Sequence, residues 1–184
     1  MKRQVLLSLL LITGFSLPAK ALILEHMGLE DLALQSEVVV FGTVAKMESR
    51  FDHRSNFRRI VTDVSIEVQS VIAGDADKIV VITVPGGEVG GKGQLVPGAP
   101  RFRLGEDVVL FLKRVPDVVE HFSIVGFTQG VFKAVREGGK VKVRQSLRSV
   151  MFQDGTPGEA LEMEFFLDDL EEKVLRVKTG AQIR

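Results

Sequence analysis

The stretch of sequence that decides the fold runs from Ile60 to Ile72 and reads IVTDVSIEVQSVI. Apolar residues alternate with polar ones along most of it, which is the pattern of a β-strand with one buried face. A straight strand of this length would span roughly 40 Å, longer than a flat sheet in a domain of this size can use. The sequence therefore predicts a strand that curls, as the strands of a barrel do.

Shorter apolar runs of strand length lie on both sides of this stretch. Residues 38–44 predict a strand buried on both faces, and helical spacing of apolar residues predicts a short helix over Leu29–Gln35 just before it. Gly138 and Gly139 separate the last two runs and predict a tight hairpin, because both central residues of such a turn need positive φ. The remaining runs are 79–84, 108–112, 122–127, 131–136 and 141–145.

This succession of strands indicates the fold class. Seven strands follow one another without alternating helices, which argues against a doubly wound α/β fold. Short antiparallel strands of this kind avoid open edges by closing into a barrel. The sequence predicts an all-β fold with flanking helices, in which an oligonucleotide/oligosaccharide-binding-like (OB-like) antiparallel barrel is followed by an amphipathic helix.

The C-terminal part of the chain changes to a helical period. A capping-box pattern with proline at the first helical position begins at Thr156, and Gly180 can end the helix. The sequence thus predicts a helix over 157–178, within a single domain that covers 22–184. Its apolar face packs on the barrel or docks a partner, and packing is the favoured interpretation. That face consists of Met163, Phe166, Leu167, Leu170, Val174 and Val177.

Residues 1–21 have the pattern of a signal peptide. Two basic residues near the start precede the apolar run 5–17, and residues 19–21 (AKA) form a small-x-small cleavage site. A retained transmembrane helix needs roughly 18 or more apolar residues without interruption, and Pro18 ends this run early. We therefore expect cleavage that leaves Leu22 as the first residue, and a secreted or periplasmic protein without a membrane span.

Composition narrows the classes of partner. Removal of the signal peptide leaves 21 basic against 24 acidic residues, a net charge of −3, which disfavours a nucleic-acid partner. The chain has no Trp and no Tyr, the aromatic residues that usually stack on sugars, and this disfavours a carbohydrate partner. It has no Cys, so the domain must fold without disulfides.

No pattern in the chain predicts catalysis or metal binding. The three histidines, His26, His53 and His121, are far apart in sequence, and none belongs to a zinc-protease motif. No serine lies in a nucleophile elbow, and the acidic run 168–172 lacks the spacing of a calcium loop. We therefore expect a protein that is not an enzyme, with no catalytic residues, no metal and no cofactor.

Two loops are candidates for binding. The stretch 85–103 begins PGGEVGGKG, but Lys92 is followed by glycine, so the phosphate-binding P-loop pattern fails, and the dinucleotide fingerprint lacks its last glycine. The stretch 50–59 is basic and aromatic and joins the two longest strands. Either loop can be a binding surface or only a connection, in which its Phe residues pack inward.

Arginine and aromatic side chains dominate the binding energy of many protein interfaces. If the two loops share one end of the barrel, they predict a partner-binding rim there. Its candidate residues are Arg50, Phe51, His53, Arg54, Phe57, Arg58, Gly86, Gly87, Gly90, Gly91, Arg101, Phe102 and Arg103.

Two resemblances rest on strand and turn residues between Leu29 and Phe132. The run 36–44 (SEVVVFGTV), with the long strand that ends VIAG at Gly74, resembles the start of the netrin-like barrel of the tissue inhibitors of metalloproteinases. The stretch 85–112, together with 126–130 (GFTQG), resembles a group of secreted bacterial proteins with no established activity. Both resemblances imply the barrel, and the first implies a protease as partner.

In the inhibitor family, an amino-terminal cysteine coordinates the zinc ion of the protease. This chain has no cysteine, so that mechanism and its residues do not carry over. We therefore expect an exported binding or inhibitor-like module with a protein partner, for which a secreted protease is one candidate. Two alternatives stay open: a structural interaction domain of the cell envelope and, less favoured, an enzyme.

Overall fold

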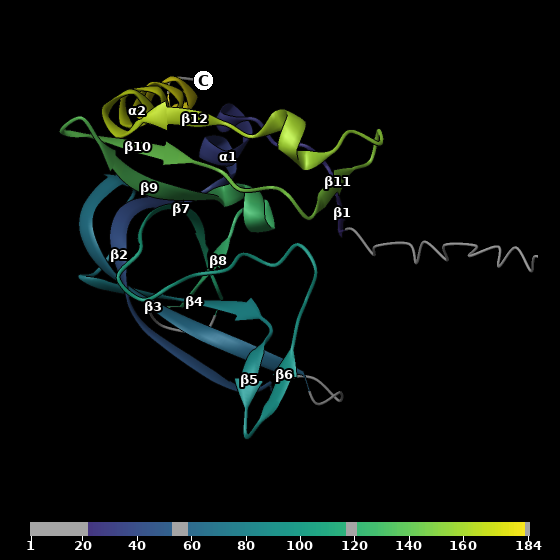
Figure 1. The fold of residues 1–184 in the computed structure, drawn as a ribbon. Coiled ribbons are helices and arrows are strands. Elements are labelled where there is room, and N and C mark those ends of the chain that lie inside the picture. The colour runs from purple at the N-terminus through teal and green to yellow at the C-terminus, as the bar shows by residue number, and fades with distance from the viewer. Residues whose placement is uncertain (1–21, 53–58, 117–120, 183–184) are drawn as a thin grey trace, which may run out of the picture.

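The computed structural model describes residues 22–52, 59–116 and 121–182, with side chains as far as Gly180. The predicted signal peptide lies outside the described residues. Figure 1 shows a β-barrel with a layer of strands and helices packed against one side of it. Among the described residues, no helix is long and apolar enough to cross a membrane.

Five strands close the barrel, in the order β2-β3-β4-β8-β7 and back to β2. Neighbours pair antiparallel except β4 and β8, which run parallel. The predicted all-β fold with a closed barrel and a C-terminal helix is confirmed, and the parallel β4–β8 pair corrects the expectation that the barrel is antiparallel throughout. The barrel strands are β2 (Val38–Phe51), β3 (Ile60–Ala73), β4 (Ile79–Pro85), β7 (Asp107–Arg114) and β8 (His121–Ile124).

The long strands curl because their pairing is irregular. The register between β2 and β3 shifts at three places, all in the first half of β2. Such bulges bend a strand and increase its twist, and Figure 1 shows both strands curving around the barrel. At the second shift, a Cβ on Gly42 would lie 2.5 Å from the carbonyl oxygen of Glu67, so only glycine permits this close approach.

The alternation along Ile60–Ala73 fills the barrel as predicted. Val64 and Ile66 point inward and are fully buried, while Glu67 is exposed. The barrel core also takes Phe102 from the connection between β4 and β7. Its buried members are Val38, Val40, Val44, Val64, Ile66, Val80, Ile82, Val84, Phe102, Val108, Leu110, Leu112, Phe122 and Val131.

The last predicted hairpin lies outside the barrel, which corrects the expectation that all seven strands close it. β9 (Val131–Glu137) and β10 (Lys140–Arg144) form the hairpin, and Gly138 and Gly139 have φ of +58° and +81° as predicted. The physical reason is that β7 pairs with two different strands along the edge that does not face β2. Its residues 108–110 pair with β9, and its residues 112–114 pair with β8 to close the barrel.

The C-terminal helix α2 spans Leu167–Gln182, so the predicted range 157–178 is wrong at both ends. Gly158–Leu161 is a 3₁₀ turn, and β12 (Glu164–Phe166) pairs with β10. Tertiary hydrogen bonds outweigh the local helical pattern here: the amide N–H of Met163 donates to the side-chain oxygen of Gln145 at 3.0 Å. Gly180 lies inside the helix instead of ending it.

The apolar stripe of α2 packs on the protein's own sheet, which is the interpretation the sequence favoured. Leu167, Leu170 and Val174 are buried in a second core, between the helices and the outer face of the barrel wall. The predicted short helix, α1 (Leu29–Gln35), lies beside α2 in this layer. Phe166, counted in the stripe, belongs instead to β12 and is 39% exposed.

The N-terminal strand β1 (Leu22–Leu24) pairs in parallel with β11 (Val150–Phe152). A third, small core lies under this pair and is built from Leu147, Val150 and Phe152. The described chain therefore begins on the surface of its own C-terminal half, beside residues that line the candidate site below.

Candidate functional site

The glycine-rich stretch folds into a small hairpin of β5 (Gly87–Val89) and β6 (Lys92–Gln94). Gly90 and Gly91 make its turn, with φ of +57° and +73°. This hairpin is part of the long connection between β4 and β7, which agrees with its interpretation as a connection rich in positive-φ turns.

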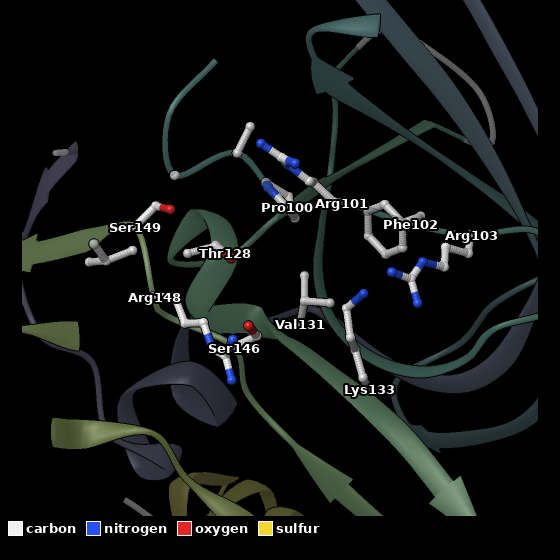
Figure 2. Close-up of a pocket in the computed structure, with 13 residues that line it drawn as sticks. Pro100, Arg101, Phe102, Arg103, Thr128, Val131, Lys133, Ser146, Arg148 and Ser149 are labelled. Atoms are coloured by element: carbon white, nitrogen blue, oxygen red, sulfur yellow. The ribbon is translucent and has the colours of Figure 1, made fainter. Parts of the chain in front are cut away.

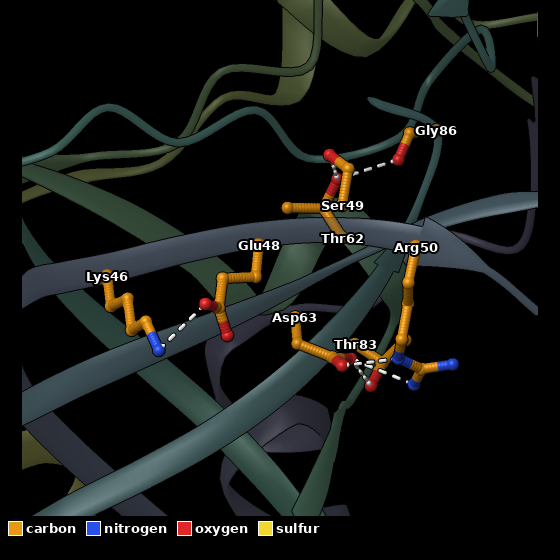
Figure 3. Close-up of polar contacts among 8 residues, drawn as sticks. All are labelled: Lys46, Glu48, Ser49, Arg50, Thr62, Asp63, Thr83 and Gly86. Atoms are coloured by element: carbon orange, nitrogen blue, oxygen red, sulfur yellow. Dashed lines mark hydrogen bonds and ion pairs between the residues drawn. The ribbon is translucent and has the colours of Figure 1, made fainter. Parts of the chain in front are cut away.

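The hairpin packs against the ends of β2 and β3. The hydroxyl of Thr62 donates to the carbonyl oxygen of Gly86 at 2.7 Å (Figure 3), and the amide N–H of Ile60 donates to the side chain of Gln94 at 2.7 Å. The described ends of the 50–59 loop lie here too, with the N–H of Asp52 bonded to the carbonyl of Arg59. The β5–β6 hairpin and the described ends of the 50–59 loop therefore lie at one end of the barrel.

Arg50, a predicted rim residue, is engaged within its own sheet. Its guanidinium forms an ion pair with the Asp63 carboxylate at 2.6 Å, and Thr83 donates to the same carboxylate at 2.6 Å (Figure 3). Burial raises the pKa of Asp63, but the hydrogen bonds from Arg50 and Thr83, together with the attraction of Arg50 and His121, lower it by more, so the pKa lies below its ordinary value. Arg50 thus joins β2 to β3. Phe51 is half-buried beside it, and His53, Arg54, Phe57 and Arg58 lie outside the described residues.

We expect this ion pair to make stability depend on acidic pH. Because the pKa of Asp63 is lowered in the folded state, its contribution is complete above the unfolded pKa of about 3.9 and is lost as pH falls through the folded pKa. Asp63→Asn should cost about 1 kcal/mol or less at pH 7, since water screens this half-exposed pair. Urea denaturation from pH 7 to pH 2.5 should show the two proteins converging below pH 4. A constant difference over that range would contradict this assignment.

Phe102 corrects the prediction of an exposed aromatic residue. It is only 7% exposed and packs in the barrel core, so the alternative interpretation of inward packing is right for this residue. It was a candidate because aromatic and arginine side chains dominate many interfaces, and inward packing was the alternative. Arg101 and Arg103 are indeed exposed.

These two arginines line a cavity of about 550 Å³, which we call the basic hollow (Figure 2). Arg148 and Lys133 complete its positive charge, and no carboxylate residue is among its lining. Lys133 forms an ion pair with Glu106 at 2.7 Å. The three arginine side chains form no ion pair with any described residue. The full lining is Gly98, Ala99, Pro100, Arg101, Phe102, Arg103, Thr128, Val131, Lys133, Ser146, Arg148, Ser149 and Val150.

Three separate segments meet at the basic hollow, and two buried glutamines hold two of them in place. The side chain of Gln145 donates to the backbone carbonyl of Gln129 at 2.6 Å. The side chain of Gln129 in turn accepts from the N–H of Met27 at 2.9 Å and donates to the carbonyl of Glu25 at 3.0 Å. Residues 128–133 and 146–150 are thereby fixed relative to each other and to the N-terminal segment.

The sequence predicted two of the four cationic residues of the basic hollow. It identified Arg101 and Arg103, but not Lys133 or Arg148, nor the hydroxyls of Thr128, Ser146 and Ser149. These residues come from β9, from the turn before it and from the stretch after β10, where no local motif marks them. Only their convergence in the fold reveals them.

A second cavity, of about 300 Å³, adjoins the first, and we call it the apolar hollow. It shares residues 99–102 with the basic hollow, so Arg101 lines both. Leu95 stands at its side and is 71% exposed, and two rim glycines, Gly86 and Gly87, contribute backbone. The other residues of its lining are Met47, Thr62, Val84, Pro85, Gln94 and Val96.

The chemistry that this arrangement offers is recognition of negative charge beside an apolar group. Guanidinium groups and hydroxyls donate hydrogen bonds to carboxylate, phosphate or sulfate oxygens. Within the described ranges, no three His, Cys, Asp or Glu side chains gather where they could hold a metal ion. The ring of His26 packs edge-on against Phe152, and His121 lies in β8.

Comparison with known proteins gives no family assignment. No protein-family model matches the chain, and no curated protein matches it.

Proposed function

We propose that this protein is an exported, non-enzymatic binding module that engages a protein partner through the basic hollow and the adjoining apolar hollow. One observation carries the proposal: three exposed arginines from two distant segments line one cavity, its lining contains no carboxylate, and none of the three forms an ion pair with a described residue. Like charges held together repel one another, so the arrangement favours a partner that brings negative charge.

An extracellular protease is the partner class to which the resemblance points, and inhibition would then come from the hollows and loops. The position of the N-terminal strand supports this choice of surface. Leu22 is paired with Val150 and packs against Gly98, where a Cβ would lie 2.7 Å from the Leu22 side chain. An N-terminus used as in the metalloproteinase inhibitors would instead have to project from the surface.

Affinity capture from the envelope and medium of the exporting cell tests the proposal. The bait is the mature chain, compared with Arg101→Gln/Arg148→Gln and with the matched control Arg144→Gln/Arg176→Gln, whose arginines are exposed and lie outside the hollow. We expect one stoichiometric partner with the wild type and the control, and its loss with the hollow variant. Equal recovery by all three baits would refute the proposed surface.

The identity of the captured partner separates the open alternatives. A protease whose activity falls on binding supports the inhibitor-like role, and an envelope component without activity supports a structural interaction domain. Turnover of a captured small molecule by the pure protein would establish an enzyme instead.

We also propose that export depends on residues 1–21 and that cleavage follows Ala21. Intact-mass measurement of the exported protein should give a chain that begins at Leu22. Export with those residues still attached would contradict this proposal.

A further inference from the structure

We propose that the partner's docking element is an acidic stretch of polypeptide with an aliphatic residue next to its carboxylates. It lies across Arg101, with carboxylates in the basic hollow and the aliphatic side chain in the apolar hollow. This inference rests on the proposed function and specifies the chemistry of the partner at that same surface.

The basic hollow is suited to several carboxylates rather than to one small anion. Its volume of about 550 Å³ is several times that of a single carboxylate or phosphate group. Figure 2 shows Arg103 and Lys133 on one side of the cavity and Arg148 on the other, with Ser146, Ser149 and Thr128 near Arg148. A ligand that satisfies both sides must therefore carry negative groups spaced along its length.

The apolar hollow explains why the ligand should not be purely acidic. Met47, Val84 and Val96 line it, and its volume of about 300 Å³ accommodates one branched aliphatic side chain. Leu95 is largely exposed beside it and would be covered by such a side chain. Because residues 99–102 belong to both cavities, one continuous ligand can occupy the two together.

An extended peptide fits this arrangement better than the other polyanions do. In an extended chain, side chains at alternate positions point the same way, so acidic and aliphatic residues two apart can enter neighbouring cavities. Single-stranded nucleic acids and neutral sugars usually stack on an exposed aromatic ring. The one aromatic residue of the two cavities, Phe102, is buried in the barrel core.

Fluorescence anisotropy with short labelled peptides tests the inference directly. The probes are GEGEGLG, its serine counterpart GEGEGSG and its neutral counterpart GQGQGLG. We expect GEGEGLG to bind the mature protein at least fivefold more tightly than either counterpart, and more weakly as salt is raised. A labelled oligothymidylate and a heparin oligosaccharide serve as competing polyanions.

Protein variants then assign the two parts of the peptide. Arg101→Gln and Arg148→Gln should each weaken GEGEGLG at least fivefold, whereas the matched control Arg176→Gln should not. Leu95→Ser should remove most of the difference between GEGEGLG and GEGEGSG, whereas Ile79→Ser, another exposed aliphatic residue far from the cavity, should preserve it. Melting temperatures of all variants show whether each remains folded.

Three results would overturn the inference. If GEGEGLG does not bind, or if Arg101→Gln leaves its affinity unchanged, an acidic docking element in this hollow is excluded. Equal affinity for GEGEGLG and GEGEGSG excludes the aliphatic part. Tighter, Arg101-dependent binding of either competing polyanion assigns the hollow to that polymer. If capture still yields an Arg101-dependent protein partner, the proposed function stands although this inference has failed.

Discussion

Replacing Leu170 by alanine is expected to lower the free energy of unfolding by about 2–5 kcal/mol. Leu170 is 0% exposed and lies in the second core, where α2 faces α1 and the outer wall of the barrel. Removing its side chain leaves a cavity among residues that the barrel holds in place, so the site cannot easily collapse. Urea denaturation of the mature chain measures the loss.

The matched control is Leu175→Ala, on the same helix but 49% exposed. It should change stability by well under 1 kcal/mol, since little buried area is lost. Equal effects of the two substitutions would mean that α2 does not pack through its buried stripe and is instead free to serve as a docking helix.

Gln145→Leu is expected to cost about 2–6 kcal/mol, because it strands two polar groups at about 1–3 kcal/mol each. The Gln145 side chain donates to the carbonyl of Gln129 and accepts from the N–H of Met163. Leucine has a similar size but can form neither bond. Because Gln145 also fixes the wall that carries Arg148, the variant should lose affinity for the captured partner as well as stability.

Gln153→Leu provides the control, because that side chain is exposed and the bond of this residue to the Leu24 carbonyl is made by its backbone N–H. Thermal melting of both variants, with amide exchange at Met163, tests the assignment. If Gln145→Leu melted at the wild-type temperature, the buried amide would not be what holds β10 and β12 together.

The sequence predicted correctly those elements whose conformation depends on their own residues. The alternation along β3 and the apolar spacing of Leu29–Gln35 gave those two elements correctly, because each one's own buried face fixes its period. The Gly138-Gly139 hairpin was also predicted, since its turn depends only on backbone freedom. The closed barrel was predicted from the succession of strands.

The sequence predictions were wrong where contacts between residues far apart in the chain determine the local structure. A capping pattern and an apolar stripe predicted helix from residue 157, but Gln145 and the edge of β10 draw Glu164–Phe166 into the sheet. Phe102 was predicted to belong to a binding rim because of its residue type, with inward packing as the alternative, and it packs in the barrel core. The basic hollow joins Arg101 to Arg148 across 47 positions of sequence, a distance at which no local motif operates.

The position of β7 between two cores has a consequence for errors in strand alignment. Val108, Leu110 and Leu112 face the barrel interior, while Val109 and Phe111 face the helical layer. A slip of one residue would therefore exchange the two sets of side chains and place Phe111 inside the barrel. Every residue from 108 to 112 is apolar, so hydrophobicity opposes the slip only at the ends of this run, where Asp107 or Lys113 would take the buried place of Val108 or Leu112. Between those ends, side-chain size must reject the slipped alignment.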